Sequence, residues 1–299
     1  MKKILVTGGT VFVSRYIAEY FVAQGHEVYV LNRNTKEQSK GAILIEADRY
    51  NLGESLRGYD FDLVVDTGYN AKAVEMLLDA IGGYKDYVFI SSSAVYSEDL
   101  PRPFTEDAEV TGNTMWGKYG TDKIEAEKLL LERVPNAYVL RPPYIYGSMN
   151  NVYRESFIFD CAMRGRKFYL PPNDEMKIQF SYIGDICRFI DVLLEKRPSQ
   201  HVFNVGNTEL VSVKDWVQLC YDAVGTSLEF VNVQSDDNQL YYFCFHDYEF
   251  SLDVTAQCQL LSDLKPISEG LKVSFAWYRD NSDKVSKRNY IKYIDEKLK

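Results

Sequence analysis

The first half of the chain alternates short apolar runs with amphipathic segments, and this alternation leaves few folds open. Buried strands are predicted where the apolar runs have strand length, at residues 3–7, 27–31, 42–46, 63–66, 86–91 and 137–140. Helices are predicted between them from the helical spacing of apolar side chains, at residues 12–24, 71–81 and 118–133. Strands that alternate with helices predict an α/β fold with a doubly wound parallel sheet covered on both faces.

The pattern changes after Arg141-Pro142-Pro143. Strands are predicted at residues 167–170, 201–205 and 228–233, and helices at 153–164, 186–195 and 213–224. Residues 290–298 form a charged tail that is also predicted to be helical. Because no low-complexity linker separates the halves, we expect two interleaved lobes around one cleft. They are a dinucleotide-binding domain at 1–147 and a smaller, mainly substrate-binding domain at 148–299, with some segments returning to the sheet.

Composition excludes several classes of protein. The 299 residues are 46% hydrophobic and 26% charged, which is enough to bury a full core. A net charge of −9 argues against a nucleic-acid binder. No run of about 18 apolar residues is present to span a membrane, and the apolar run after the N-terminal lysines is too short for a signal peptide. Five scattered cysteines and three dispersed histidines indicate reduced thiols in a cytoplasmic protein and argue against a metal site.

The segment Thr7-Gly8-Gly9-Thr10-Val11-Phe12-Val13-Ser14 joins the first strand to the first helix. This is the position of the dinucleotide-binding turn of a Rossmann-type fold, in which the pyrophosphate lies on the helix N-terminus. Val11 and Ser14 replace the second and third glycines of that turn; Ser14 is small enough to keep the packing, whereas Val11 is expected to alter the approach of the pyrophosphate. A glycine turn without a ligand is the alternative. The predicted cofactor contacts here are Gly8, Thr10, Val11, Phe12 and Val13.

The ends of the next strands bear on the choice of cofactor. The second strand is followed by Asn32 and Arg33, with no acidic residue to bind a ribose 2′-hydroxyl. Arg33 could pair with a 2′-phosphate, which favours NADP over NAD; a solvated surface arginine is the alternative. Asp48 is placed to meet an adenine amino group, or else caps a turn. Thr67 and Ser91, at the ends of later strands, complete the predicted cofactor contacts on this edge of the sheet.

Tyr119 and Lys123 stand four residues apart on a predicted helix, so both face the same side. A lysine ammonium near the phenol would lower the tyrosine pKa and make Tyr119 a general acid/base, and Lys123 could also hold the nicotinamide ribose. Ser91-Ser92-Ser93 follows the fifth strand, where a hydroxyl can orient a substrate oxygen toward Tyr119. An exposed amphipathic pair is the alternative for Tyr119 and Lys123.

Several segments together resemble the extended short-chain dehydrogenase/reductase superfamily, in the NAD-dependent epimerase/dehydratase group. They run in the family's order over most of the chain: Thr7-Gly8-Gly9-Thr10, residues 90–96, Tyr119-x-x-x-Lys123, residues 140–147 and residues 203–207. The resemblance implies that Ser92, Tyr119 and Lys123 are catalytic. It also implies that Pro142 and Tyr144 line the nicotinamide, and that the chain forms a homodimer through helices 71–81 and 118–133.

Two departures from the family pattern narrow the resemblance. With Val11 and Ser14, the loop resembles an atypical branch that reads Gly-Gly-Thr-x-Phe and includes chloroplast RNA-associated relatives. Sugar 4,6-dehydratases resemble the pattern around Ser92 but carry Asp-Glu after the catalytic hydroxyl. Ser93 and Ala94 stand there in this chain, which argues against dehydration.

A local excess of basic residues in the second half suits a nucleotide-sugar diphosphate: Arg141, Arg154, Arg164, Arg166, Lys167 and Lys177. Ser93, Arg154 and Lys177 are the predicted substrate contacts. The sequence thus predicts an NAD(P)-dependent epimerase or reductase that acts on a nucleotide sugar or similar small molecule. A non-catalytic dinucleotide sensor or scaffold on the same fold is the alternative, followed by an RNA-associated protein.

Overall fold

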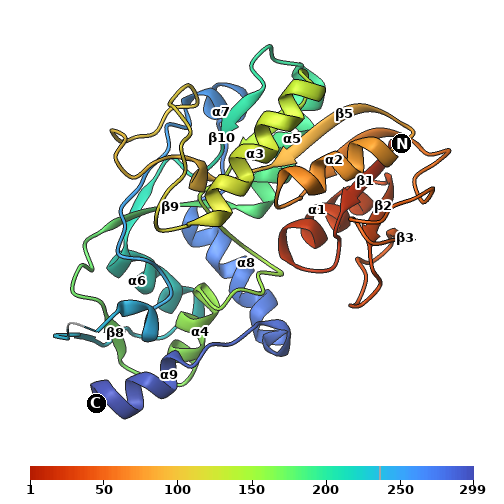
Figure 1. Cartoon of the computed structure of the whole chain (residues 1–299). Helices are drawn as coiled ribbons and strands as arrows, with labels where there is room; N and C mark the ends of the chain where they lie inside the picture. The colour runs from red at the N-terminus through yellow and green to blue at the C-terminus, as the bar shows by residue number, and fades with distance from the viewer. Residues whose placement is uncertain (236) are drawn as a thin grey trace.

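A computed structural model describes residues 1–235 and 237–299 of the chain. At its centre lies a seven-stranded sheet with the order β10-β6-β5-β4-β1-β2-β3, and every neighbouring pair is parallel (Figure 1). Its strands are β1 (Lys3–Thr7), β2 (Glu27–Asn32), β3 (Ile43–Glu46), β4 (Asp60–Asp66), β5 (Gly83–Ile90), β6 (Tyr138–Arg141) and β10 (Val202–Asn204). The predicted doubly wound sheet is confirmed, and the strand order reverses between β1 and β4, where such folds bind ligands.

Helices cover both faces of this sheet because its central strands are apolar on both sides. In β1, Ile4 and Val6 pack with α1 (Phe12–Ala23) and α5 (Ile183–Lys196). Leu5, between them, packs on the opposite face with α2 (Ala71–Ala80) and α3 (Lys118–Arg133). Successive side chains of a strand point to opposite faces, so one short apolar run supplies both halves of the core.

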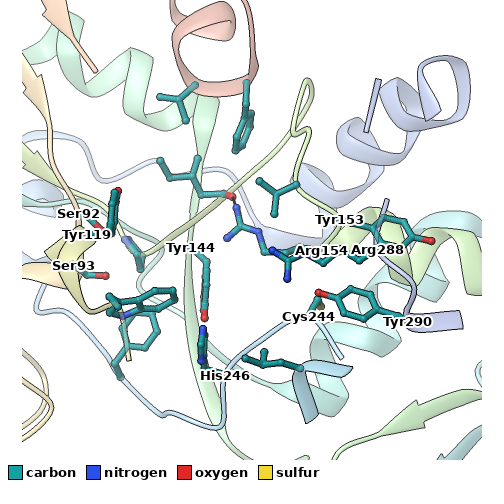
Figure 2. Close-up of a pocket in the computed structure, with 18 residues that line it drawn as sticks. Ser92, Ser93, Tyr119, Tyr144, Tyr153, Arg154, Cys244, His246, Arg288 and Tyr290 are labelled. Carbon is teal, nitrogen blue, oxygen red and sulfur yellow. Dashed lines mark hydrogen bonds between the residues drawn. The ribbon is translucent and has the colours of Figure 1, made fainter. Parts of the chain in front are cut away.

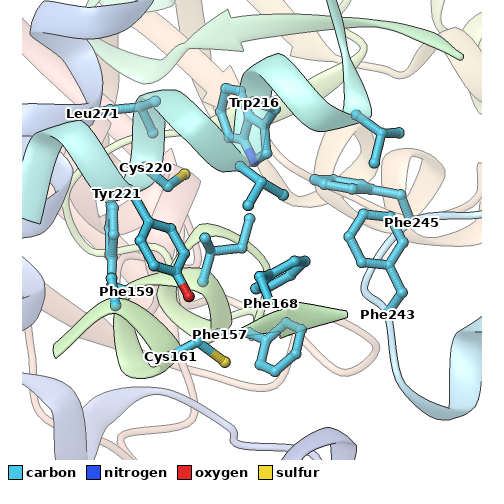
Figure 3. Close-up of a cluster of buried hydrophobic side chains, with 14 of the residues drawn as sticks. Phe157, Phe159, Cys161, Phe168, Trp216, Cys220, Tyr221, Phe243, Phe245 and Leu271 are labelled. Carbon is cyan, nitrogen blue, oxygen red and sulfur yellow. The ribbon is translucent and has the colours of Figure 1, made fainter. Parts of the chain in front are cut away.

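The second lobe is built on an aromatic core (Figure 3). Phe180 stacks on the buried Trp216 with ring centroids 3.5 Å apart. Two small sheets contribute, one of β7 (Tyr144–Tyr146), β9 (Lys177–Tyr182) and β11 (Leu210–Ser212), the other of β8 (Phe168–Leu170) and β12 (Phe230–Asn232). The helices of this lobe are α4 (Glu155–Met163), α6 (Val213–Val224), α8 (Ile267–Asp280) and α9 (Tyr290–Tyr293), which continues as a π-helix over Ile294–Leu298. The short helix α7 (Thr255–Leu260) instead packs on β10 and α5 of the first lobe.

β7, β9, β11 and α8 in this lobe were not predicted from the sequence, and neither was α7. β7 and β11 have three residues each, which is too short for a period to show. Residues 201–205, predicted as a strand of the second half, instead supply β10 to the central sheet. Over the described ranges, none of the helices has both the length and the apolar character needed to cross a membrane.

Candidate active site

A cavity of about 400 Å³ lies at the carboxyl edge of the central sheet, where the two lobes meet (Figure 2). One side is formed by residues from the segments that leave the carboxyl ends of the strands: Phe12 and Val13 at the start of α1 after β1, Ser92 and Ser93 after β5, and Pro143 and Tyr144 after β6. Side chains of the second lobe form the other side. The cavity therefore occupies the place where parallel α/β sheets bind their ligands.

The glycine loop has a backbone that only glycine adopts without strain. Gly8 and Gly9 have φ angles of +92° and +80°. A Cβ atom on Gly8 would lie 2.8 Å from Ser14 Oγ, and one on Gly9 would lie 2.3 Å from Val30 Cγ1. Asn32 Nδ2 donates to the Gly8 carbonyl over 2.7 Å, so this predicted cofactor contact supports the loop.

The N-terminus of α1 fits a pyrophosphate. Its N-cap residue is Val11, and none of the described side chains caps the helix, which leaves first-turn amides to bind an anion. Val11 is 37% exposed, whereas Ser14 is buried and its Oγ donates to the Val11 carbonyl over 3.1 Å. Ser14 therefore stands where the third glycine usually allows helix and strand to pack closely. Val11 lies next to the position that an anion would take.

Replacing Gly9 by alanine is expected to destabilise the protein by about 2–4 kcal/mol. About 1 kcal/mol comes from the positive φ, and the rest from the clash with Val30. Gly25 is the matched control because its φ is also +80° but an added Cβ would meet nothing within 4 Å. Urea unfolding of both variants measures the difference; equal losses for Gly9→Ala and Gly25→Ala would show that the loop has room to relax.

The other predicted contacts at the cofactor end lie close to the sheet edge. Thr67 Oγ1 donates to the Thr7 carbonyl over 2.9 Å, which ties the ends of β1 and β4 together. Asp48 accepts a hydrogen bond from the Tyr50 amide. Its carboxylate therefore caps a turn, which was the alternative to a contact with the adenine amino group. Arg33 is exposed just beyond β2. Ser91 is buried and donates to Glu127, which directs its hydroxyl away from the cavity wall.

Ser92 and Tyr119 meet on one side of the cavity, as Figure 2 shows. The expectation that the pKa of Tyr119 is lowered is wrong for this structure. Burial of the hydroxyl raises the pKa of Tyr119, although its side chain as a whole is 38% exposed. A hydrogen bond with Ser92 and the charge of Arg154 act in the opposite direction but do not outweigh burial. The phenol therefore stays protonated at neutral pH.

Lys123 is oriented away from the Tyr119 phenol. Its Nζ donates to the carbonyls of Gly68 and Ile90, each over 2.7 Å, and lies 4.6 Å from the centre of the Phe89 ring. The side chain is buried, and burial lowers the pKa of Lys123 to about 8. The i,i+4 spacing thus places both residues on one face of α3 without bringing the ammonium to the phenol.

The predicted basic stretch does not form a common patch, because most of its members pair with carboxylates. Arg141 is buried and contacts Glu127 at 2.6 Å. Three further pairs join Arg164 to Asp160, Arg166 to Asp295, and Lys167 to Glu229.

Of the predicted substrate contacts, Ser93 and Arg154 line the cavity. Lys177 instead lies exposed at the start of β9, outside the described cavity wall. Of the residues expected near the nicotinamide, Tyr144 reaches the cavity, whereas Pro142 is buried behind it and its carbonyl accepts from the Ser93 amide over 2.9 Å.

Several cavity residues were not predicted from the sequence. They come from three separate segments: Trp116 from the loop before α3, Cys244 and His246 from the loop before α7, and Arg288 and Tyr290 from the C-terminal region. None belongs to a short local motif. Burial lowers the pKa of His246, which therefore lines the cavity as a neutral ring at pH 7.

Comparisons with known proteins agree with this geometry. A sequence profile described as the NAD dependent epimerase/dehydratase family matches residues 4–206. Chloroplast stem-loop binding protein of 41 kDa b from Arabidopsis thaliana is 27% identical over 75% of this chain, and the match spans 64% of that protein. UDP-N-acetyl-alpha-D-glucosaminuronate decarboxylase from Bacillus cytotoxicus is 24% identical over 93% of this chain and 98% of the relative.

A solved structure extends the similarity to the fold. The dTDP-glucose 4,6-dehydratase of Bacillus anthracis, crystallised with NAD, superposes with a TM-score of 0.75 over 95% of this chain and 99% of that one, at 18% identity. The fold predicted from the strand and helix pattern is therefore confirmed. Since the family profile covers more than half of the residues, the chain belongs to the NAD-dependent epimerase/dehydratase family.

Proposed function

We propose that the chain is an NAD-dependent enzyme that acts on a nucleotide-linked sugar, as an epimerase or a reductase. The observation that carries this proposal is that Ser92 and Tyr119 meet in a cavity that also opens onto Phe12 and Val13 of the glycine loop. Support comes from the family, from a relative named for a UDP-sugar substrate and from a fold relative crystallised with NAD.

Each residue of the site has a distinct role in this proposal. Ser92 polarises the substrate oxygen, and Tyr119 transfers its proton to or from that oxygen. The loop from Gly8 to Val13 binds the pyrophosphate, and Lys123 holds the ribose with the one N–H of its ammonium that does not donate to Gly68 or Ile90. When bound, NAD supplies the hydride acceptor for this chemistry. Because burial raises the pKa of Tyr119, the phenol enters the reaction protonated, as protonation of a sugar ketone requires, although it is a weaker acid than an ordinary tyrosine.

Three finer points are part of the proposal. Arg33 is free to approach a 2′-phosphate from the end of β2, so NADP is compared with NAD in the test below. We place the boundary between the cofactor and substrate lobes at residue 147. We also keep the expectation of a homodimer through α2 and α3, which light scattering of the purified chain measures.

The test uses thermal unfolding of the full chain with NAD and with NADP, followed by chromatography of nucleotide sugars incubated with the cofactor-bound protein. At about 100 times the Kd, a cofactor is expected to stabilise the fold by about 2.7 kcal/mol. Conversion of a UDP-sugar to an epimer, or its reduction with NADH, then supports the enzyme. A chain that is stabilised by a cofactor but converts no nucleotide sugar would fit a dinucleotide sensor instead.

Absence of stabilisation by either cofactor would overturn the proposal. The Arabidopsis relative is named for stem-loop binding, but we do not propose this role, because a net charge of −9 opposes binding to a phosphate backbone. Salt-sensitive retention of RNA in a gel shift would reverse that choice.

A further inference from the structure

Asp66, the last residue of β4, is a fully buried carboxylate at the carboxyl edge of the sheet. Its two oxygens accept hydrogen bonds from the two Nη atoms of Arg49, each over 2.7 Å, in a bidentate ion pair. Three further donors reach the same carboxylate: Thr7 Oγ1 at the end of β1, the Tyr87 hydroxyl of β5 and the Gly68 amide. Five donors from separate segments hold the carboxylate in one position and satisfy both of its oxygens.

Gly68 connects this carboxylate to Lys123. Its amide donates to Asp66 Oδ1 over 2.8 Å, and its carbonyl accepts from Lys123 Nζ over 2.7 Å. The Arg49 guanidinium packs closely against the same residue, because a Cβ atom on Gly68 would lie 2.9 Å from Arg49 Nη2. The second acceptor of the ammonium is the carbonyl of Ile90, which ends β5. The position of Lys123 therefore depends on two strand ends, and Asp66 orders one of them.

The ion pair also contributes to the charges around Lys123, which is 3% exposed. Burial lowers the pKa of Lys123 to about 8, the carboxylates of Asp66 and Glu127 act in the opposite direction, and Arg49 adds to the lowering. Other groups near it are the Tyr69 and Phe89 rings, the Tyr119 phenol on the preceding helical turn, and Arg141, which pairs with Glu127. Outside α3, Asp66 is the carboxylate that favours the charged amine.

The protonation state of Lys123 decides whether a donor remains for a ligand. An ammonium has three N–H bonds, of which the carbonyls of Gly68 and Ile90 accept two. A neutral amine has two, and both would be used. Only the charged form therefore keeps an N–H for a ribose hydroxyl.

We propose that the Arg49–Asp66 ion pair positions Lys123 for the cofactor ribose, by ordering residues 67–69 so that the Gly68 carbonyl holds the ammonium with one N–H free. Asp66 and Arg49 are positioning residues, since they act through Gly68 and Lys123. This inference rests on the proposed function, because it concerns the residue that binds the ribose there.

The experiment measures the titration of Lys123 in the cofactor-free full chain, by NMR of labelled lysine Cε atoms assigned with Lys123→Met. Calorimetry then measures NAD affinity at pH 6 and pH 8. Asp66→Asn removes a favourable charge, so the pKa of Lys123 should fall from about 8 by about one unit or more. At pH 8 the charged fraction then falls from about one half to about one tenth, and NAD should bind up to about fivefold more weakly. At pH 6 the amine stays charged in both proteins, so the affinities should nearly agree.

Asp62→Asn is the matched control. Asp62 lies near the other end of β4, where it pairs with Lys85 and accepts from the Lys3 amide. Its loss should leave the titration of Lys123 and the NAD affinity nearly unchanged at both pH values. The double variant Arg49→Met/Asp66→Asn leaves no unpaired guanidinium in the interior and serves if Asp66→Asn fails to fold. It should lower the pKa of Lys123 by less, because an opposing charge is removed as well.

Three results would overturn the inference. In the unmodified protein, titration of Lys123 near 10.4 would show that its ammonium is in water and not on the Gly68 carbonyl. A pKa of Lys123 that stays the same in both variants would show that the ion pair does not act on it. Equal losses of NAD affinity at pH 6 and pH 8 in Asp66→Asn would make the pair a structural element alone. Failure of the unmodified protein to bind NAD would overturn the proposed function and the ribose contact, whereas the predicted shifts in the cofactor-free chain would still support the positioning of Lys123.

Discussion

Tyr119→Phe is expected to lower turnover of a nucleotide sugar by about 10²- to 10⁴-fold, the usual contribution of a positioned acid or base. The substitution removes only the hydroxyl that meets Ser92 in the cavity, and the ring keeps its edge-to-face contact with Tyr69. Binding of NAD, measured by thermal shift, should therefore change little. Steady-state rates with the accepted sugar measure the loss, which should appear in kcat rather than in cofactor affinity.

Tyr69→Phe is the matched control for this prediction. The Tyr69 ring lies 6.3 Å from the Tyr119 ring, is 68% exposed and stands outside the described lining of the cavity. Loss of its hydroxyl should leave turnover within a few-fold of the unmodified protein. Similar rate losses in the two variants would indicate that the aromatic pair, rather than the Tyr119 proton, supports the reaction.

Glu127→Ala is expected to destabilise the fold by about 3–5 kcal/mol, because it leaves the buried Arg141 without its partner. Both side chains of this ion pair are nearly inaccessible, at 6% and 4% exposure. Arg141 also donates to Tyr96, which in turn donates to Asn204 of β10. One carboxylate on α3 thus organises polar groups from several elements, and urea denaturation measures its contribution.

Glu125→Ala provides the comparison on the same helix. Glu125 is exposed, so its loss should change stability by no more than about 0.5 kcal/mol. The double variant Glu127→Ala/Arg141→Met should recover part of the stability, since removing both charges also removes the unpaired one. If Glu127→Ala behaves like Glu125→Ala, water reaches Arg141 and the pair is not truly buried.

The parts of the site that could be predicted are those encoded in short stretches of sequence. Gly8 and Gly9 signal a positive φ at a strand–helix turn, and the structure has this geometry. The place of the serines after β5 follows from element order, because the carboxyl ends of parallel strands share one edge. The place of Tyr119 also follows from element order, because α3 connects β5 to β6. Such features depend on neighbours within a few residues, which a single sequence displays directly.

Features that depend on distant partners could not be predicted. In the sequence, Arg141 resembles an ordinary basic surface residue, because nothing near it in the chain indicates that it pairs with Glu127. The spacing of Tyr119 and Lys123 defines a shared helix face, but burial and two backbone carbonyls decide where the ammonium points. Arg288 reaches the cavity only through the path of the C-terminal chain. No local pattern in a single sequence records these long-range contacts.

The pairing of β10 with β6 has a consequence for synthesis on the ribosome. β6 is an interior strand only because β10 hydrogen-bonds along its outer side. A nascent chain that has emerged only to residue 147 lacks β10, so the outer backbone groups of β6 have no partner within their own molecule. Open edges of this kind can pair with other chains and start aggregation. The later-translated half of the protein therefore acts as the cap that closes this edge.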